Sequence, residues 1–355
     1  MRTLTVLQLL PALSSGGVER STLETAAALV RAGHRSVVVS AGGRLVADLE
    51  TAGSTHVLLD IGRKSATTLR QILPLRRLLK QWQPDIVHAR SRLPAWLGWL
   101  ALQRGRLPRT HFVTSVHGLN SPGAYSSILT RGERVICVSE TVRAHVLRHW
   151  PQTPPARLLV IEPGIDPGEF TAAAQERSGS GTLLLMPGRG TRLKGHAAAI
   201  ELLAGMRAAG VDARLTLLGA REAGREAYIA ELEALARARG VAGQLSIEAP
   251  SAQVLDAYRG CDLVLQLSAK PEAYGRTVVE ALSVGKPVVG WDHGGVGELL
   301  ARLFPEGRVP KGDPQALLAT TLRLLSEARR PAPVHAQTLA AMQAQTLGLY
   351  ESIAG

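Results

Sequence analysis

The sequence predicts an α/β protein built from two doubly wound domains, each around a parallel sheet. Its 355 residues are enough for about two domains. Short apolar runs alternate with helical stretches in two series, which is typical of βαβ units. The polar stretch TAAAQERSGSG, residues 171–181, separates the series and is typical of a linker. We therefore expect a first domain in residues 1–165, a second in 166–332, and a terminal helix in 333–355 that packs back onto the first domain.

The first series consists of short apolar runs, each with the length and composition of a buried strand. They are LTVLQLL, RSVVVSA, HVLLD, PDIVHA, THFVTSV and RVICVS. The helical candidates between them lie at 19–31, 66–81 and 141–149. The run LLVIEPGIDPGEF closes this half with a strand and a Pro/Gly turn, which interrupts regular structure before the linker.

The second series begins after the linker with the run TLLLMPGRG. It continues through ARLTLLG, QLSIEA, CDLVLQLS and KPVVGWD. Helical stretches at 195–207, 224–239 and 276–284 intervene, and a last helix is expected at 334–353. Open parallel sheets bind ligands beyond the carboxyl ends of their strands, so the loops that leave these runs are the candidate site loops.

Composition favours a cytoplasmic protein. The two cysteines, Cys137 and Cys261, lie inside apolar runs and are interpreted as buried, reduced thiols. The apolar run at the N-terminus ends at Pro11, and a glycine-containing loop and a helix follow at once, which argues against a signal peptide. No window has the roughly 18 consecutive apolar residues that a membrane span needs.

The net charge of +12 is confined to the first half of the chain. Residues 1–165 hold 21 Lys and Arg against 9 Asp and Glu, whereas the remainder holds 20 of each. This asymmetry indicates an anionic partner for the first half. Nucleic acid is a poor candidate, because aromatic residues make up only 4% of the chain and no helix-turn-helix, zinc or aromatic RNA-binding signature is present.

The segment GRKSATTLRQILPLRRLLK combines basic and apolar residues and allows two interpretations. Its leucines could insert partly into an anionic bilayer, or they could pack on the sheet while only the basic groups face water. The second interpretation is favoured for the leucines, and the basic groups still attract lipid head groups. We therefore hypothesise peripheral binding to the inner face of the cytoplasmic membrane. The basic residues are Arg63, Lys64, Arg70, Arg76, Arg77 and Lys80, and the apolar ones are Leu69, Ile72, Leu73, Leu75, Leu78 and Leu79.

Two loops have the composition of phosphate-binding loops. LLPALSSGGVER places Gly16 and Gly17 before a helix, where close backbone approach and the helix N-terminus favour an anion. MPGRGTRLKGH places Arg189 and Lys194 beside the start of another helix, which would make a diphosphate clamp. The plain alternatives are a tight turn and a solvated basic turn.

A third loop, PEAYGRTVVEALSVGKPVV, carries two glutamates eight residues apart. Gly275 allows a tight turn into a helix that begins near Arg276, so that the amides of Gly275, Arg276 and Thr277 would point at an anion. Glu272 precedes this helix, and Glu280 lies about one turn into it. Carboxylates accept two hydrogen bonds from vicinal hydroxyls, so the pair suits a ligand with a sugar at each end and phosphates between them.

These motifs resemble the retaining glycosyltransferases of family 4, which have the GT-B fold of two Rossmann-like domains facing a central cleft. The third loop is similar to the E-x7-E segment of that family, and GRGTRLKGH is similar to its arginine–lysine phosphate motif. GGVER, PDIVHARSR, SVHG and RVICVSE resemble segments of its first domain. The resemblance spans nearly the whole chain, although IEPGID stands where the family commonly has an Asn-Gly pair.

The resemblance implies a role for each matching residue. Glu272 would contact the donor hexose, His117 would reach the same sugar, and Glu280 would bind the ribose. Arg189, Lys194 and the amides of Gly17, Gly275, Arg276 and Thr277 would bind the donor diphosphate. The implied activity is transfer of a hexose-type sugar from a nucleoside diphosphate sugar, UDP-sugar favoured, to a glycan or glycolipid of lipopolysaccharide or another surface polysaccharide. The donor would bind mainly to the second domain and the acceptor to the first.

No metal or further cofactor is expected, because no Asp-x-Asp motif is present and the pair His145 and His149 lacks an evident third ligand. A glycosidase would also use two carboxylates, but the accompanying diphosphate clamp favours a sugar-nucleotide donor. Two alternatives stay open: a sugar-nucleotide epimerase of the same fold, which needs no acceptor, and a non-enzymatic protein that binds an anionic ligand. His117 has its own plain alternative, a hydrogen-bonded histidine at the end of a strand.

Overall fold

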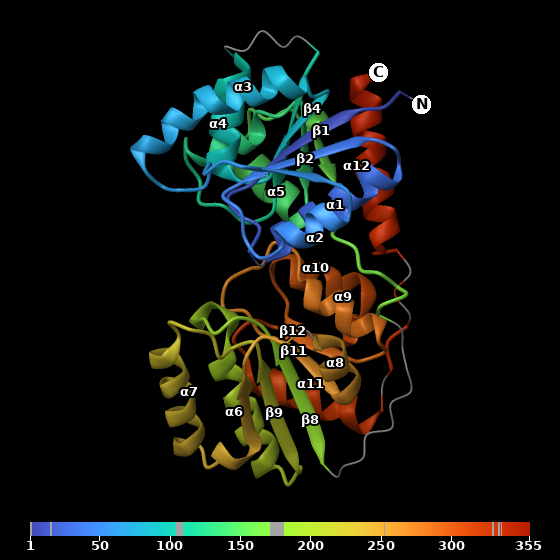
Figure 1. Cartoon of the computed structure of the whole chain (residues 1–355). Helices are drawn as coiled ribbons and strands as arrows, with labels where there is room; N and C mark the ends of the chain where they lie inside the picture. Colours follow the sequence, from blue (N-terminus) through green and yellow to red (C-terminus); the bar gives the residue numbers. More distant parts are fainter. Residues whose placement is uncertain are drawn as a thin grey trace. The chain divides into compact units, whose positions relative to one another are not determined.

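The computed structural model describes residues 2–14, 16–103, 109–170, 181–251, 253–328, 330–332, 334 and 336–355. The chain divides into two compact units (Figure 1). Unit 1 comprises residues 1–164 and 339–355, and unit 2 comprises residues 165–338. Residues 171–180 of the proposed linker lie outside the described residues.

The described part of unit 1 has a seven-stranded parallel sheet in the order β3-β2-β1-β4-β5-β6-β7. Its central strands are fully buried apolar runs, as expected for a parallel sheet covered on both faces. The strands are β1 (Thr5–Leu9), β2 (Arg35–Ser40), β3 (Thr55–Leu58), β4 (Ile86–Ala89), β5 (His111–Val116), β6 (Arg134–Cys137) and β7 (Leu158–Val160).

Helices connect these strands and cover the sheet. Helices α3 and α4 lie side by side, and the C-terminal helix α12 runs along α1 (Figure 1). The α-helices of unit 1 are α1 (Gly17–Arg31), α2 (Val46–Thr51), α3 (Ile72–Trp82), α4 (Arg92–Gln103), α5 (Glu140–His149) and α12 (Leu339–Ala354). The 3₁₀ helices are η1 (Ala66–Gln71), η2 (Ser126–Thr130) and η3 (Pro155–Arg157).

Helix α12 completes the core of unit 1. Met342, Leu349 and Tyr350 are at most 6% exposed and join the cluster formed by Leu29 of α1 and Ile86 of β4. The last helix in the sequence therefore buries apolar surface against the first helix and the sheet.

The described part of unit 2 has a six-stranded parallel sheet in the order β10-β9-β8-β11-β12-β13. Its strands are β8 (Thr182–Pro187), β9 (Ala213–Leu218), β10 (Leu245–Glu248), β11 (Leu263–Gln266), β12 (Val288–Trp291) and β13 (Arg308–Val309). Its α-helices are α6 (His196–Ala208), α7 (Glu226–Ala238), α8 (Val254–Gly260), α9 (Arg276–Ser283), α10 (Gly294–Leu303) and α11 (Pro314–Ser326). Its 3₁₀ helices are η4 (Arg192–Lys194), η5 (Ala242–Gln244) and η6 (Pro305–Gly307).

The helix predicted at 66–81 is instead a 3₁₀ helix followed by α3. Ser65 caps the 3₁₀ segment by accepting from the amide of Thr67, and the α-helix begins only at Ile72. Pro74 explains the position of this junction, because proline lacks an amide proton and is tolerated only in the first turn of an α-helix.

The terminal helix begins five residues later than the sequence predicted, at Leu339 instead of Val334. Immediately before it, the carbonyl of Gln337 accepts from the amide of Ile165 at 3.0 Å, and Thr338 forms a parallel bridge with Ile165. These backbone groups are used in extended pairing, so they are not available to a helix.

Among the described residues, no helix is long and apolar enough to cross a membrane.

Candidate donor and acceptor sites

The strand order of unit 2 brings two of the predicted motifs together. Strands β8 and β11 are neighbours, but the chain leaves them toward opposite edges of the sheet. The loops that follow two such strands diverge and leave a crevice, which is where open α/β sheets bind ligands. The loop after β8 carries Arg189 and Lys194, and the loop after β11 carries Glu272.

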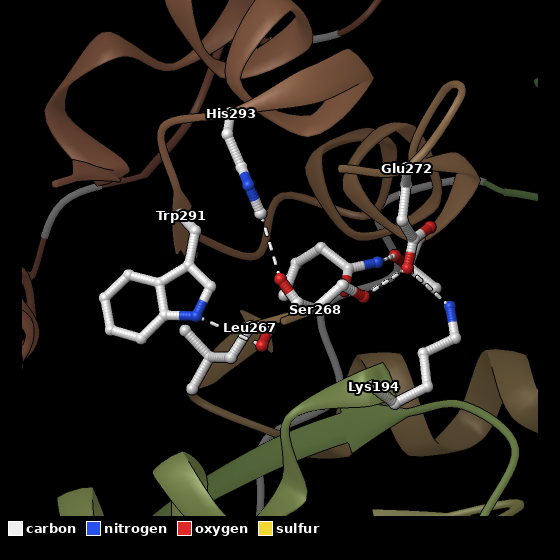
Figure 2. A network of polar contacts seen from close by, with 8 residues as sticks. Lys194, Leu267, Ser268, Glu272, Trp291 and His293 are labelled. Carbon is white, nitrogen blue, oxygen red and sulfur yellow. Dashed lines mark hydrogen bonds and ion pairs between the residues drawn. The ribbon is translucent and has the colours of Figure 1, made fainter. Parts of the chain in front are cut away.

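Lys194 and Glu272 form an ion pair in this crevice, with 2.6 Å between Nζ and Oε1 (Figure 2). The Ser268 hydroxyl also contacts Oε1 of Glu272. Both charged side chains are about three-quarters buried, at 25% and 24% exposure. The pair joins positions 78 residues apart in the sequence and holds the predicted hexose-binding carboxylate beside the predicted diphosphate-binding cation.

The loop that carries Glu272 is anchored by backbone contacts to the next strand and helix. His293 Nε2 donates to the carbonyl of Ser268 at 2.9 Å, and Trp291 Nε1 donates to the carbonyl of Leu267 at 3.1 Å (Figure 2). The amide of Gly295, in the first turn of α10, donates to the carbonyl of Glu272 itself at 2.8 Å. The position of this carboxylate is therefore set by a rigid frame.

Two glycines make this close approach possible. Gly195 has a φ of +82°, and a Cβ there would lie 1.9 Å from the carbonyl oxygen of Leu267. Gly294 has a φ of +59°, and a Cβ there would lie 2.7 Å from the carbonyl oxygen of Glu272. No other residue type fits these positions without moving the backbone.

Helix α9 begins at Arg276 directly after Gly275, whose φ is +118°. The Thr277 hydroxyl accepts a hydrogen bond from Gln266 Nε2 at 2.7 Å, which ties the first turn of the helix to the end of β11. The three predicted amide donors thus lie at the start of one helix, where the helix dipole favours an anion.

Glu280 is buried, with 8% exposure, and both of its oxygens are already engaged. Oε1 lies 3.3 Å from Nε of Arg276, and Oε2 accepts from the hydroxyl of Tyr258 at 2.8 Å. Burial and the Glu280 carboxylate raise the pKa of Tyr258 well above its ordinary value, so this phenol stays protonated and donates. A ribose that binds Glu280 must therefore share Oε1 with Arg276.

Arg189 and Gly17 are placed differently from the residues just described. The Arg189 side chain is exposed and has no side-chain partner in the part of the chain that the structure describes. Gly17 belongs to unit 1 and opens α1, and a Cβ there would meet nothing within 4 Å. The neighbouring Gly16 does favour glycine, because its φ is +139°, a backbone conformation that other residues rarely adopt.

In unit 1, His117 follows β5 and lines a small cavity with Arg90, which follows β4. The cavity holds about 20 Å³, room for roughly one water molecule. Within the described structure, His117 Nε2 is shielded from solvent and has no hydrogen-bond partner. Burial and the positive charge of Arg90 lower the pKa of His117 to about 3, so the imidazole is neutral at physiological pH.

Arg90 is 4% exposed and is held by neutral groups. Its Nε donates to Gln8 at 2.7 Å, and its two terminal nitrogens donate to Ser21 at 3.1 Å and Thr25 at 2.8 Å. Tyr350 of α12 also hydrogen-bonds this guanidinium, and the same hydroxyl lies 2.6 Å from Nδ1 of His88. The network joins α1, β1, β4 and α12 around a buried cation, and the negative charge of Glu24 offsets part of the cost of burying it.

Sequence reasoning did not single out four residues of these clusters: Ser268, His293, Tyr258 and Arg90. Two carried a usable signal. Ser268 ends an apolar strand run, and Arg90 directly follows the run PDIVHA, at the positions where parallel sheets bind ligands. Tyr258 and His293 carried none, because only the packing of α8 and α10 brings them to the site.

Among the described residues, no group of three or more His, Cys, Asp and Glu side chains is placed to hold a metal ion. His145 and His149 face each other with ring centroids 4.5 Å apart, and His145 Nε2 lies 2.9 Å from the carbonyl oxygen of Asn120.

Two family models together match residues 15–337 of the chain. The model "Glycosyltransferase Family 4" matches residues 15–169, and the model "Glycosyl transferases group 1" matches residues 169–337. This chain belongs to the GT-B glycosyltransferases of the family 4 and group 1 type. The first match lies almost entirely in unit 1 and the second almost entirely in unit 2.

Relatives and solved structures agree with this assignment. A D-inositol 3-phosphate glycosyltransferase from Xylanimonas cellulosilytica is 28% identical over 240 residues, which are 60% of this chain and 56% of that protein. The match thus spans little more than half the length of this relative. A glycosyltransferase structure from Rickettsia africae has a TM-score of 0.86 at 24% identity and covers 99% of both chains. The structure of HepE from Anabaena, in complex with UDP and glucose, has a TM-score of 0.82 at 20% identity and covers 98% of this chain and all of that one. The predicted fold class, two doubly wound α/β domains of the GT-B type, is confirmed.

Proposed function

We propose that this protein is a retaining glycosyltransferase that moves a hexose-type sugar from a nucleoside diphosphate sugar to a glycan or glycolipid. The Lys194–Glu272 pair at the β8/β11 crevice carries the proposal. A protein that binds a sugar ring needs hydrogen-bond acceptors for the sugar hydroxyls, and one that binds a diphosphate needs a fixed cation. The Glu272 carboxylate and the Lys194 ammonium offer the two side by side.

The donor diphosphate would bind where the cations and helix N-termini of unit 2 converge. Lys194 would exchange part of its contact with Glu272 for a phosphate oxygen, and the exposed Arg189 would close on the same group. The amides of Gly275, Arg276 and Thr277 would add hydrogen bonds from the start of α9, and Gly17 would contribute from the start of α1.

The two glutamates would hold the two sugars of the donor. Glu272 has a second oxygen, Oε2, available to hexose hydroxyls while its loop stays anchored. Glu280 would accept from the ribose hydroxyls through Oε1, with Tyr258 holding the other oxygen. His117, neutral and with an unpartnered Nε2, would hydrogen-bond a hexose hydroxyl from unit 1.

The reaction proposed is a front-face displacement. The acceptor hydroxyl attacks the anomeric carbon from the side on which the diphosphate leaves, forming the new C–O bond as the bond to the phosphate oxygen breaks. The departing phosphate oxygen takes the proton of the acceptor hydroxyl, so no side chain is needed as a general base. Lys194, Arg189 and the α9 amides stabilise the negative charge that develops on the diphosphate. These cations supply the charge that a metal ion supplies elsewhere, and the transfer is proposed to be metal-independent.

UDP-sugar is the favoured donor, because the similar HepE structure was obtained with UDP and glucose. For the acceptor, the relative from Xylanimonas cellulosilytica is named for D-inositol 3-phosphate, a phosphorylated polyol. We extend this to a phosphorylated or lipid-linked glycan of a surface polysaccharide such as lipopolysaccharide, which would also suit the positive charge of the first half. A cytoplasmic location is proposed because Cys137 and Cys261 are both buried free thiols, whose pKa values burial raises to about 12.

The test is a thermal-shift panel of UDP-, GDP-, ADP- and dTDP-sugars, followed by product analysis with the donor that binds. A glycosyltransferase stabilised by one donor should hydrolyse it slowly and release the nucleoside diphosphate with the free sugar retaining its anomeric configuration. An epimerase would instead give an altered sugar without any acceptor. A protein that binds the donor and never releases the nucleoside diphosphate, with or without glycan acceptors, would contradict the proposal.

A further inference from the structure

The positive charge of the protein is concentrated in one fifth of the chain. Residues 61–132 contain 12 Lys and Arg and a single acidic residue, Asp85, so they carry +11 of the total +12. Asp85 is itself occupied inside unit 1, where it accepts from the amide of Thr5 at 2.8 Å and pairs with Arg2. No acidic side chain in this region is left to neutralise the basic groups.

This region includes two helices that lie side by side. It contains η1, α3, α4 and η2, and α3 contacts both η1 and α4 (Figure 1). The basic residues of this region that the structure describes therefore lie on or beside neighbouring elements of one unit and add up to one field of positive potential.

The segment formed by η1 and α3 also exposes two large apolar side chains. Leu69 is 53% exposed and Leu73 is 60% exposed. Within α3, Leu73 and the exposed Arg77 are four residues apart, the spacing that puts side chains on the same side of an α-helix, and Leu69 precedes them in η1. Leu75 and Leu79, by contrast, are completely buried.

Burial divides the leucines of this segment into two groups. Leu75 and Leu79 are buried in unit 1, as the favoured interpretation holds, but Leu69 and Leu73 are exposed and do not pack on the sheet. Arg63, Lys64, Arg70, Arg77 and Lys80 are exposed around them. We call these seven side chains the basic leucine face.

The basic leucine face starts at the end of the sheet where the candidate site of unit 1 lies. It follows β3, as His117 follows β5, Arg90 follows β4 and Gly17 follows β1. In a parallel sheet the carboxyl ends of all strands meet at one edge, so the loop that carries Arg63 and Lys64 leaves this same edge. A surface bound there would lie at the edge where unit 1 is proposed to receive its acceptor.

We propose that the basic leucine face docks on an anionic lipid bilayer, with Leu69 and Leu73 inserted at the level of the head groups. A bilayer offers both things that the face needs, negative charge for the basic groups and an apolar layer for the leucines. Nucleic acid would satisfy only the charge and would leave both leucines in water or against phosphates. The proposal goes beyond the transfer reaction, and its test needs neither donor nor acceptor.

The test is co-sedimentation of the full chain with vesicles of phosphatidylcholine alone or with about 30 mol% phosphatidylglycerol, without any sugar nucleotide. Binding is expected to require the anionic lipid and to fall steeply between about 0.1 M and about 0.5 M salt. Each basic group near the surface contributes roughly fivefold to partitioning, so the double variant Arg70→Glu/Arg77→Glu should bind at least about 25-fold more weakly.

The leucines are tested by the double variant Leu69→Ser/Leu73→Ser, which keeps every charge. If the two leucines insert partly, this variant should bind anionic vesicles about tenfold more weakly than the wild type, because only the basic groups then hold the protein on the membrane. Matched controls lie in unit 2. Arg225→Glu/Arg237→Glu reverses two exposed arginines at the ends of α7, and Leu193→Ser removes a leucine that is 53% exposed. Both controls should bind like the wild type.

Equal recovery on neutral and anionic vesicles, or no recovery at low salt, would overturn the proposal. The proposal would also be overturned if the variants of the basic leucine face bound anionic vesicles like the wild type. The same holds if the unit 2 control variants lost as much binding as the variants of the face. Retention of double-stranded DNA at about 0.15 M salt, together with no vesicle binding, would assign the charge to nucleic acid instead. Circular dichroism and melting of each variant show whether a loss reflects the surface or the fold.

Discussion

At the scale of single residues, Glu272 and Glu280 differ in what already holds them. Glu272 pairs with Lys194 and is about one quarter exposed, whereas Glu280 is buried against Arg276 and Tyr258. Glu280→Gln should therefore weaken both the nucleoside diphosphate and the intact donor by about 1.5–3 kcal/mol, the usual worth of a charged hydrogen bond. Glu272→Gln should leave nucleoside diphosphate affinity nearly unchanged and lower turnover. Calorimetric titration with UDP separates the two, and equal losses of UDP affinity would contradict the assignment.

The diphosphate clamp can be tested with three basic residues of one loop. Lys194→Met should cost about 1.5–3 kcal/mol of donor binding, and Arg189→Met should cost less, because exposed charges are screened by water. Arg192 provides the control, since it lies in the same loop but pairs with Glu231 at the surface. Arg192→Met should bind the donor like the wild type. A loss at Arg192 as large as that at Lys194 would mean that general loop charge, and no specific clamp, attracts the donor.

His117 should not titrate in the physiological range. Burial and Arg90 lower its pKa to about 3, below the ordinary value near 6.5, so the folded protein binds fewer protons here than the unfolded chain. The stability that this difference contributes is complete above about pH 6.5 and is lost as the pH falls toward the folded pKa, by at most about 1.4 kcal/mol per pH unit. In proton NMR, the His117 ring resonances should stay constant between about pH 5 and 8. A titration midpoint near 6.5 would show that His117 is solvated and would weaken its assignment to the donor sugar.

At the scale of elements, the turn from β8 into α6 depends on Gly195. Gly195 and Gly210 have nearly the same φ, +82° and +81°, but only Gly195 would bring a Cβ against a carbonyl oxygen, at 1.9 Å. Gly210→Ala should therefore lower the free energy of unfolding by about 1–2 kcal/mol, from the strained backbone conformation alone. Gly195→Ala should cost at least about 2 kcal/mol more and should weaken donor binding by displacing Lys194. Urea denaturation and donor titration measure the two effects, and equal costs for both variants would show that the turn can relax.

Strand positions and most helix starts followed well from the sequence, but the starts of α3 and α12 did not. Apolar runs predicted β1 to β12, because a strand in a covered parallel sheet is buried on both faces. The two-residue strand β13 was missed because Arg308–Val309 is too short to form a pattern. The predicted starts of α3 and α12 were wrong because other interactions decide where these helices begin. Pro74 restricts the start of α3, and the pairing of Thr338 with Ile165 delays the start of α12.

At the scale of the whole molecule, the C-terminal helix belongs to the unit in which the chain begins. Tyr350 of α12 is completely buried, and its hydroxyl contacts His88 and Arg90 beneath the candidate acceptor side of unit 1. Tyr350→Phe should destabilise unit 1 by about 1–3 kcal/mol, because it leaves buried polar groups without their partner. Hydrogen exchange should show faster exchange in β4, α1 and α12 while unit 2 stays protected.

Tyr125→Phe is the matched control in the same unit. Tyr125 is 44% exposed, and its ring, which the substitution keeps, is the part that contacts Arg92. This variant should change stability by no more than about 0.5 kcal/mol. If Tyr350→Phe changed stability as little as Tyr125→Phe, the buried network around Arg90 would not depend on the C-terminal helix.

The sequence alone determined the alternation of strands and helices, the two halves of the chain, and the three loops with phosphate-binding composition. These features are local, because burial periodicity, glycine and proline act over a few residues. Tertiary structure alone decided that Lys194 meets Glu272, that Tyr258 holds Glu280, and that Arg90 is buried beside His117. It also decided that Leu69 and Leu73 face outward while Leu75 and Leu79 do not. The reason is that such contacts follow from the order of strands in a sheet and from which helix covers which face, and neither is encoded in any single stretch of residues.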